Sequence, residues 1–297
     1  MIRFGVDFGG TKIEAAALDS DGAFVARVRK PNPGNYDEAL EVVADLLADA
    51  ETMAGARAER LGMGIPGSIS PRTGLIRNAN SVYLNGRAFE QDLVTRLKRP
   101  VRLANDANCL ALSEAADGAG AGQGVVFAAI LGTGCGGGVV VDGRIIEGRN
   151  GIGGEWGHTP LPWPRPEEYP GPACWCGRKG CLETWISGPA FALDAGRASG
   201  QDAMSAAQVG DASALAALDR YIDRTGRALA AMCDLLDPDV IVLGGGMSNV
   251  EALYERLPAA MAPHVFSDTF ETPVRKAMHG DSSGVRGAVW LWPPQDA

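Results

Sequence analysis

Three cysteines, Cys174, Cys176 and Cys181, stand within eight residues of one another. Cysteine thiolates and histidine nitrogens are preferred ligands of Zn²⁺, and a closed structural site needs four of them. The nearest upstream histidine lies before the proline-rich segment 160–172, which can form a loop that returns it to the cysteines. The spacing therefore predicts a structural zinc site, and the alternative is a reduced, metal-free trio. The predicted ligands are His158, Cys174, Cys176 and Cys181.

His158 has two ring nitrogens and can therefore have two roles in this arrangement. A histidine that ligates zinc through one ring nitrogen keeps its second N–H for another acceptor. That acceptor could be a hydroxyl group of a sugar, next to Glu155, which lies three residues upstream. Cys109 and Cys233 stand in apolar, helix-like stretches and are expected in the core, whereas Cys135 receives no role.

Asp106 follows the expected strand Val101–Ala104 and precedes a helix-like stretch, residues 107–116. An aspartate at this place can cap the helix, which stabilises it by about 1 kcal/mol. It can also act as a general base, because transfer of a phosphoryl group needs a carboxylate near the attacking hydroxyl. The local sequence allows both interpretations, and they are compatible.

Three groups of glycines could hold a nucleotide. Glycine lets backbone N–H groups approach an anion without interference from Cβ. The first two groups lie between strands and the third ends a strand, so the alternatives are tight turns and a strand-to-helix turn. We expect the first two to bind phosphates and the third to pack against adenine. Their residues are Asp7, Gly9, Gly10, Thr11 and Lys12; Gly132, Thr133, Gly134, Gly136, Gly137 and Gly138; and Gly244, Gly245 and Gly246.

The elements that must position these residues form an internal repeat. Residues 4–25 and 125–146 each read as three strands joined by a glycine turn and an Asp-Gly turn. Each is followed by a helix-like stretch, a strand, another helix and a last strand. A duplicated α/β fold with two sheets facing a cleft is the expected result. The glycine-rich segment 117–122 marks the boundary, giving an N-terminal domain of residues 1–117 and a C-terminal domain of residues 118–284.

Composition excludes several classes of protein. The net charge of −9 and the lack of a basic stretch argue against a nucleic-acid surface. No apolar run reaches the roughly 18–20 residues that span a bilayer, and the start of the sequence lacks a secretory signal. We therefore expect a cytoplasmic protein that binds neither nucleic acid nor membrane.

Together these motifs resemble the ROK family (repressor, open reading frame, kinase) of bacterial sugar kinases and regulators. The resemblance extends over nearly the whole chain, and the cysteines combined with Glu-x-Gly-His are its most specific part. Within the family, the chain is most similar to manno(fructo)kinases. The stretches that carry this likeness include 64–71, 78–86, 154–163, 271–276 and 279–292.

The resemblance implies an actin-like, ribonuclease-H-like fold, with a final helix, about 285–297, that packs on the N-terminal domain. It implies ATP with Mg²⁺, Asp7 near the metal, Asp106 as the base, a structural Zn²⁺ and a homodimer. The residues implied to contact the sugar are Gly67, Asn80, Asn105, Asp106, Glu155, His158 and Glu183.

The resemblance further implies a fructokinase that could also accept mannose. Kinases for glucose or N-acetylglucosamine are the alternative, because small changes in pocket contacts alter the choice of sugar. A sugar-sensing repressor of the same family is a further alternative, but its helix-turn-helix would have to precede the first strand, which begins near residue 2. A non-catalytic zinc module is disfavoured by the glycine groups and Asp106.

Overall fold

The computed structural model describes residues 2–292. Within them the chain forms two compact units, which are described separately. The first unit comprises residues 2–121, 143–153 and 279–292, and the second comprises residues 122–142 and 154–278. The sequence-based boundaries at 117/118 and 284/285 differ from this division, because residues 143–153 and His279 onward are counted with the first unit. The predicted final helix extends to 297, and its residues 293–297 lie outside the described part.

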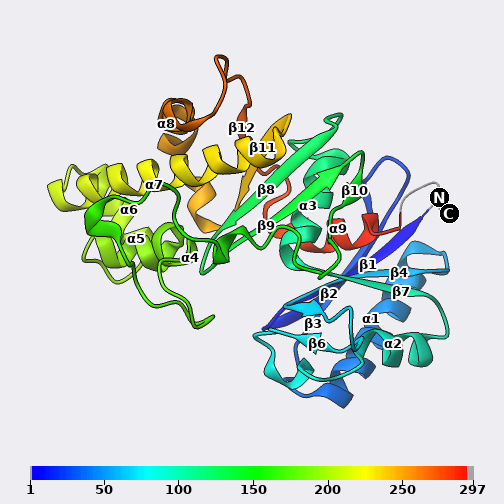
Figure 1. The fold of residues 1–297 in the computed structure, drawn as a ribbon. Coiled ribbons are helices and arrows are strands. Elements are labelled where there is room, and N and C mark those ends of the chain that lie inside the picture. Colours follow the sequence, from blue (N-terminus) through cyan, green and yellow to red (C-terminus); the bar gives the residue numbers. More distant parts are fainter. Residues whose placement is uncertain (1, 293–297) are drawn as a thin grey trace. The chain divides into compact units, whose positions relative to one another are not determined.

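A five-stranded mixed sheet forms the centre of the first unit (Figure 1), in the order β3-β2-β1-β4-β7. Strands β1, β2 and β3 are antiparallel neighbours, whereas β1, β4 and β7 run parallel. The bounds are β1 Arg3–Phe8, β2 Lys12–Leu18, β3 Phe24–Pro31, β4 Leu61–Ile65 and β7 Val101–Asn105, with the small pair β5 Ser68–Ile69 and β6 Ile76–Arg77. The third strand of the predicted segment 4–25 is β3, which begins at Phe24 and extends to Pro31, beyond the predicted end.

Helices cover this sheet. Helices α1 (Tyr36–Ala54) and α2 (Phe89–Leu97) contribute the apolar residues of the core, such as Val43 and Leu93, which pack with Val6. Helices α3 (Asp106–Asp117) and α9 (Ser283–Trp290) pack against each other, and α9 lies against β1 and β4. This approach is close, since a Cβ at Gly62 would stand 1.8 Å from the backbone oxygen of Ala288.

The second unit repeats the plan. Strands β9, β8, β11 and β12 are neighbours in that order, with β8 and β9 antiparallel and β8, β11 and β12 parallel. Their bounds are β8 Val125–Leu131, β9 Cys135–Val141, β11 Val240–Gly244 and β12 Val274–Lys276, while β10 (Arg144–Ile145) follows in the chain. The helices are α4 Glu183–Ile186, α5 Gly188–Asp194, α6 Gly200–Gln208, α7 Ala212–Leu236 and α8 Glu251–Met261.

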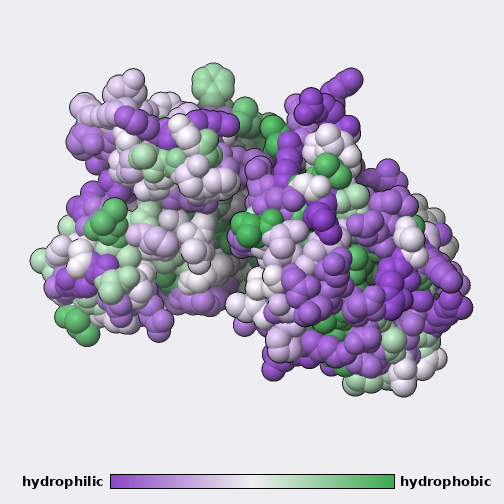
Figure 2. All heavy atoms as spheres, turned by 90° about the horizontal axis from the view of Figure 1, so that it is seen from below, coloured by the Kyte–Doolittle hydropathy of each residue, from purple (hydrophilic) through white to green (hydrophobic). Residues whose placement is uncertain are grey.

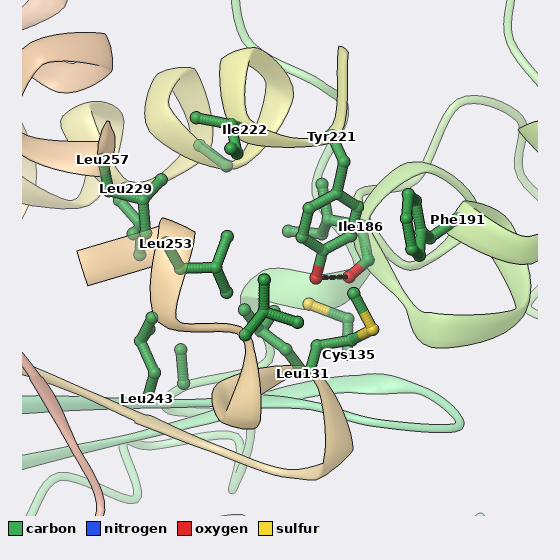
Figure 3. Packing of buried hydrophobic residues seen from close by; sticks show 14 of the residues in the cluster. Leu131, Cys135, Ile186, Phe191, Tyr221, Ile222, Leu229, Leu243, Leu253 and Leu257 are labelled. Atoms are coloured by element: carbon green, nitrogen blue, oxygen red, sulfur yellow. Dashed lines mark hydrogen bonds between the residues drawn. The ribbon is translucent and has the colours of Figure 1, made fainter. Parts of the chain in front are cut away.

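The core of the second unit gathers around α7 (Figure 3). Tyr221 of α7 is buried, and its hydroxyl donates a hydrogen bond of 2.9 Å to the backbone oxygen of Ile186. Helix α7 contacts α4 and α5, and its buried apolar residues belong to the same core as those of β8 and β11. The predicted duplication into two α/β units with mixed sheets is confirmed.

The surface has an ordinary distribution of polar groups. Figure 2 shows a largely hydrophilic face on which apolar side chains stand singly or in small groups. Among residues 2–292, none of the helices has both the length and the apolar character that crossing a bilayer requires.

Candidate active site

Asp106 is the first residue of α3, and its neighbour Asn105 is the cap. The Asn105 side chain accepts a hydrogen bond of 2.7 Å from the backbone N–H of Asn108. The interpretation of Asp106 as the N-cap is therefore wrong. The backbone of Asn105 is extended, and this geometry places the Asn105 side chain over the first turn of the helix. The residue Asp106 is exposed, and its Oδ1 accepts a local bond of 2.8 Å from the N–H of Ala107.

Asp7 is the second carboxylate of this part of the first unit. Desolvation by burial, aided by the charges of Asp106 and Glu14 and opposed by Lys12, raises the pKa of Asp7 to about 6. Desolvation by the surrounding protein also raises the pKa of Asp106, although backbone N–H groups at Ala107 and Asp106 oppose the rise. Two carboxylates in this part of the unit, of which Asp106 disfavours the charge of Asp7, could hold a divalent cation and accept a proton.

Small residues leave room for the Asp7 carboxylate. A Cβ at Gly284, in the first turn of α9, would come within 2.7 Å of Oδ2 of Asp7, and one at Gly64 would lie 3.6 Å from Oδ1. The positive charge of Lys12 is shared between two carboxylates. It opposes the rise in the pKa of Asp7, and its Nζ also lies 3.7 Å from the carboxylate of Glu14. The first glycine group therefore presents a carboxylate at the end of β1 and exposed backbone at Gly10 and Thr11.

Asn32 braces this first glycine turn from the neighbouring strand end. Its side-chain NH₂ donates to the backbone oxygen of Gly9 at 2.7 Å, and its backbone N–H donates to the oxygen of Thr11 at 2.9 Å. The Tyr83 hydroxyl in turn donates to Oδ1 of Asn32 at 2.5 Å. Sequence reasoning missed both residues, because they lie far from the turn in the chain and belong to no motif.

Two further residues implied to contact the sugar lie in the first unit. Gly67 has φ +78°, and a Cβ there would stand 2.4 Å from the backbone oxygen of Arg77, so packing alone already requires glycine. Asn80 is exposed. Asn85 positions its loop, since the Asn85 amide both accepts from the N–H and donates to the oxygen of Ala79, each at 2.9 Å.

The cysteine–histidine cluster, which we define as His158, Cys174, Cys176 and Cys181, lies within the second unit. One ligand atom from each of the four lies within 4.8 Å of all the others. Sγ of Cys174 is 3.6 Å from Nδ1 of His158, and the Sγ atoms of Cys176 and Cys181 are also 3.6 Å apart. Tetrahedral Zn–S bonds of about 2.3 Å would separate two sulfurs by about 3.8 Å, so the four residues fit zinc.

Backbone geometry around the cluster explains how it forms. The N–H of Gly177 donates to the oxygen of Cys174, closing a turn, and Gly177 has φ +87°, which favours glycine. An isolated bridge joins Pro160 to Cys181, and Arg178 donates to the backbone oxygen of His158 at 3.0 Å. These contacts bring His158 back to the cysteines, as the predicted loop requires.

Glu183 follows the cluster and contacts the second glycine group. Its Oε1 accepts a bond of 2.7 Å from the indole N–H of Trp175, and its Oε2 accepts one of 3.1 Å from the backbone N–H of Cys135. Trp175 was missed as a site residue, since it lies between two cysteines and carried no motif of its own. Glu155 is exposed, three residues before His158.

The second glycine group was predicted as one loop, but it is divided. Gly132, Thr133 and Gly134 form the turn, whereas Gly136, Gly137 and Gly138 belong to strand β9. At Gly137 the absence of a side chain has a packing cause, because a Cβ there would lie 2.8 Å from the ring of Trp156. The indole N–H of Trp156 also donates to the oxygen of Gly136 at 2.7 Å.

A cavity of about 890 Å³ opens beside the turn in the second unit. Gly132, Thr133 and Gly246 line it together with residues of α5, α6 and α8. Gly244 is buried in β11, and Gly245, at φ +82°, lies against the backbone of Leu131. Of the third glycine group, only Gly246 therefore lines the cavity, at the start of a short 3₁₀ segment, Gly246–Asn249. Its size suits a ligand as large as a nucleotide.

Comparison with known proteins assigns the chain. Residues 3–295 match the ROK family. The chain belongs to the ROK family. It is 38% identical to the N-acetyl-D-glucosamine kinase of Pectobacterium atrosepticum, over 97% of this chain and 98% of that one. It is likewise 38% identical to the enzyme of the same name from Pasteurella multocida, over 98% and 99%.

Solved ROK structures have the same fold. A ROK hexokinase from Thermus thermophilus matches with a TM-score of 0.88 and 35% identity, over 98% of this chain and 97% of that chain. A ROK glucokinase from Streptomyces griseus, in complex with glucose and AMPPNP, matches with a TM-score of 0.77 and 26% identity, over 98% and 99%. The actin-like fold and the prediction of an ATP-dependent ROK sugar kinase are confirmed at this level, whereas fructose as the acceptor is not.

Proposed function

We propose that this ROK protein transfers the γ-phosphoryl group of ATP to the 6-hydroxyl of a hexose, with Asp106 as the general base. The proton of the hydroxyl passes to the carboxylate of Asp106 while the new O–P bond forms and the bond from the γ-phosphorus to the β,γ-bridging oxygen breaks, releasing ADP. The observation that carries the assignment is the position of Asp106. It is exposed at the start of α3, and Asn105 fulfils the capping role in its place.

The residues that we assign to the nucleotide are described unit by unit. The turn Gly132–Gly134 and Gly246 line the cavity of about 890 Å³, which supports a role for them around ATP. Exposed backbone at Gly10 and Thr11 supports a role in phosphate binding. When bound, Mg²⁺ would neutralise charge on the phosphates, and Asp7 is the carboxylate we assign to it. Its raised pKa fits a group whose charge is more favourable beside a cation.

The zinc would act through positioning only. Four protein ligands close a tetrahedral site and leave no position for a reacting group. Since Nδ1 of His158 faces the sulfur of Cys174, Nε2 is the nitrogen left to donate to a sugar hydroxyl. The other sugar contacts that we propose are Gly67, Asn80, Asn105, Glu155 and Glu183.

The acceptor sugar that the curated relatives favour is N-acetyl-D-glucosamine. D-fructose is the second candidate, and it rests only on the resemblance to manno(fructo)kinases inferred from the sequence, at residues 64–71 and 271–276 among others. Identity of 38% over nearly the whole chain is compatible with either acceptor, because one hydroxyl or methylene contact changes the choice of sugar.

A coupled assay of ADP release tests the proposal. The wild-type chain is assayed with N-acetyl-D-glucosamine, D-fructose, D-mannose and D-glucose, and phosphorus NMR of the product locates the ester. The highest kcat/KM names the acceptor, and a 6-phosphate is expected. ADP release that no sugar stimulates would refute the kinase assignment, and an ester at another carbon would refute the 6-hydroxyl.

A further inference from the structure

A second cavity, of about 420 Å³, lies wholly within the first unit. The start of β1, the connection between α1 and β4, and the end of α9 form its walls. Arg3 and Asp7 are four residues apart on one extended strand, so roughly 13 Å of backbone separates this cavity from the carboxylates of the candidate active site. It is therefore a different place from the one where we assign the chemistry.

The charged residues that line this cavity are Arg3, Arg57, Arg60 and Glu59. Three guanidinium groups and one carboxylate leave an excess of two positive charges, in a chain whose net charge is −9. Guanidinium groups bind phosphate and carboxylate oxygens with paired hydrogen bonds. A phosphate monoester carries close to two negative charges at neutral pH, which matches this excess.

Arg3 supplies the strongest sign of a missing partner. Its Nε and Nη1 are buried, and among the residues that the structure describes neither atom has a hydrogen-bond partner. The guanidinium lies 4.5 Å from the centre of the Trp290 ring, a contact that fixes its place without satisfying its N–H groups. A buried donor without an acceptor is costly, and a shift of the Arg3 side chain that brings these N–H groups to an anion in the cavity would remove that cost.

The remaining walls are held by hydrogen bonds and ring contacts and are partly apolar. Trp292 donates from its indole to the backbone oxygen of Leu61 at 3.0 Å, and its ring is contacted by Arg60 at 5.2 Å and Arg102 at 4.1 Å. Arg102 is itself held by the oxygen of Leu291 at 2.6 Å. Ile2, Phe4, Ala56 and Val289 add apolar surface. Such a lining suits a ligand with a carbon skeleton as well as an anionic group.

We propose that this cavity binds a small organic phosphate, such as a sugar phosphate, separately from the reacting substrates. Arg3 and Arg60 hold the phosphate oxygens, and the apolar wall contacts the carbon skeleton. The volume of the cavity lies in the range of sites for small molecules.

Calorimetric titration of the full chain tests this site. Glucose 6-phosphate is titrated while AMPPNP and the preferred acceptor sugar are kept at saturating concentration, so that the nucleotide and sugar sites are filled. One glucose 6-phosphate per chain should bind. Arg3→Met and Arg60→Met, which keep the apolar part of the side chain, should each weaken binding at least about tenfold. Arg29→Met, at an exposed arginine of β3, is the control and should not change it.

The outcomes distinguish an organic phosphate from inorganic phosphate as the ligand. A melting curve shows that each variant is folded, and Arg60→Met carries the test if Arg3→Met does not fold. Inorganic phosphate should bind at least about tenfold more weakly than glucose 6-phosphate, and equal binding would overturn the organic part of the proposal. No binding of either anion, or equal binding by the wild type and by the folded arginine variants, would overturn the site itself.

Discussion

The indole N–H of Trp175 donates a hydrogen bond of 2.7 Å to Oε1 of Glu183. The other carboxylate oxygen of Glu183 accepts from the backbone N–H of Cys135, directly after the turn Gly132–Gly134. Trp175 stands between two residues of the cysteine–histidine cluster. One carboxylate thus connects that cluster with the second glycine turn.

Trp175→Phe keeps the ring and removes only the donor. A hydrogen bond to a charged group contributes about 1.5–3 kcal/mol, and an exposed one less, so we expect kcat/KM to fall about tenfold. Steady-state kinetics measures it, and Trp163→Phe, at an indole that is also exposed, is the control. Unchanged kcat/KM in Trp175→Phe would show that Glu183 is positioned without Trp175.

Asp106→Asn preserves size and removes the base. General base catalysis contributes about 10²–10⁴-fold, so kcat should fall at least about a hundredfold while binding of sugar and ATP is retained. Rapid-quench kinetics and calorimetry measure the two effects separately. Asp21→Asn, at an exposed turn, should leave both unchanged. A variant that keeps a tenth or more of wild-type kcat would exclude Asp106 as the base.

Elemental analysis of the purified protein should find about one zinc per chain. Cys176→Ser removes one of the four ligands and should lose the metal, together with a lower melting temperature, because metal binding contributes to folding. Cys233→Ser changes a buried cysteine of α7 outside the cluster and should keep the zinc. Zinc-free wild-type protein prepared without chelators would contradict the site.

Asp7 should make the ligand-free protein less stable as pH rises. Its pKa is about 6 in the folded chain against an ordinary value of 3.8, so between these values the native state binds more protons than the unfolded state. The stability that it contributes is present below about pH 4 and is lost as pH rises through about 6. The difference corresponds to about 1–3 kcal/mol.

Asp7→Asn should therefore raise the melting temperature at pH 7 without Mg²⁺ or nucleotide, and this gain should vanish near pH 4. Thermal unfolding at both pH values measures it. Asp37→Asn, at a side chain that is 93% exposed, serves as the control. A gain of equal size at both pH values would exclude the charge of Asp7 as its cause.

Asn32→Ala should loosen the first glycine turn, because it removes the bond to the oxygen of Gly9. We expect KM for ATP to rise about five- to tenfold, the effect of about 1 kcal/mol. Tyr83→Phe, which removes only the hydroxyl that holds Asn32, should cause a smaller rise. Initial rates at varied ATP measure both, and an unchanged KM in Asn32→Ala would assign the turn to a purely structural role.

The sequence predicted the duplicated fold because strands and turns recur in the same order in both halves. Spacing within eight residues was enough to select the three cysteines, and a proline-rich loop was enough to select His158. Asn32 and Tyr83 could not be found in this way, since they are separated by 51 residues and meet only after the sheet has formed. The cap at Asn105 was missed because two adjacent polar residues are equally able to cap, and only the backbone angles decide between them.

The order of elements along the chain has a consequence for biosynthesis. The sheet of the first unit is covered on one side by α9, which begins at Ser283, whereas its strands are complete by Asn105. Gly5 and Gly62 are the positions at which α9 packs closely on β1 and β4. During translation, α9 therefore cannot cover them until the whole second unit has been synthesised. A nascent chain that stops before residue 283 would expose this surface, which makes the first unit a natural substrate for chaperones until synthesis of α9 is finished.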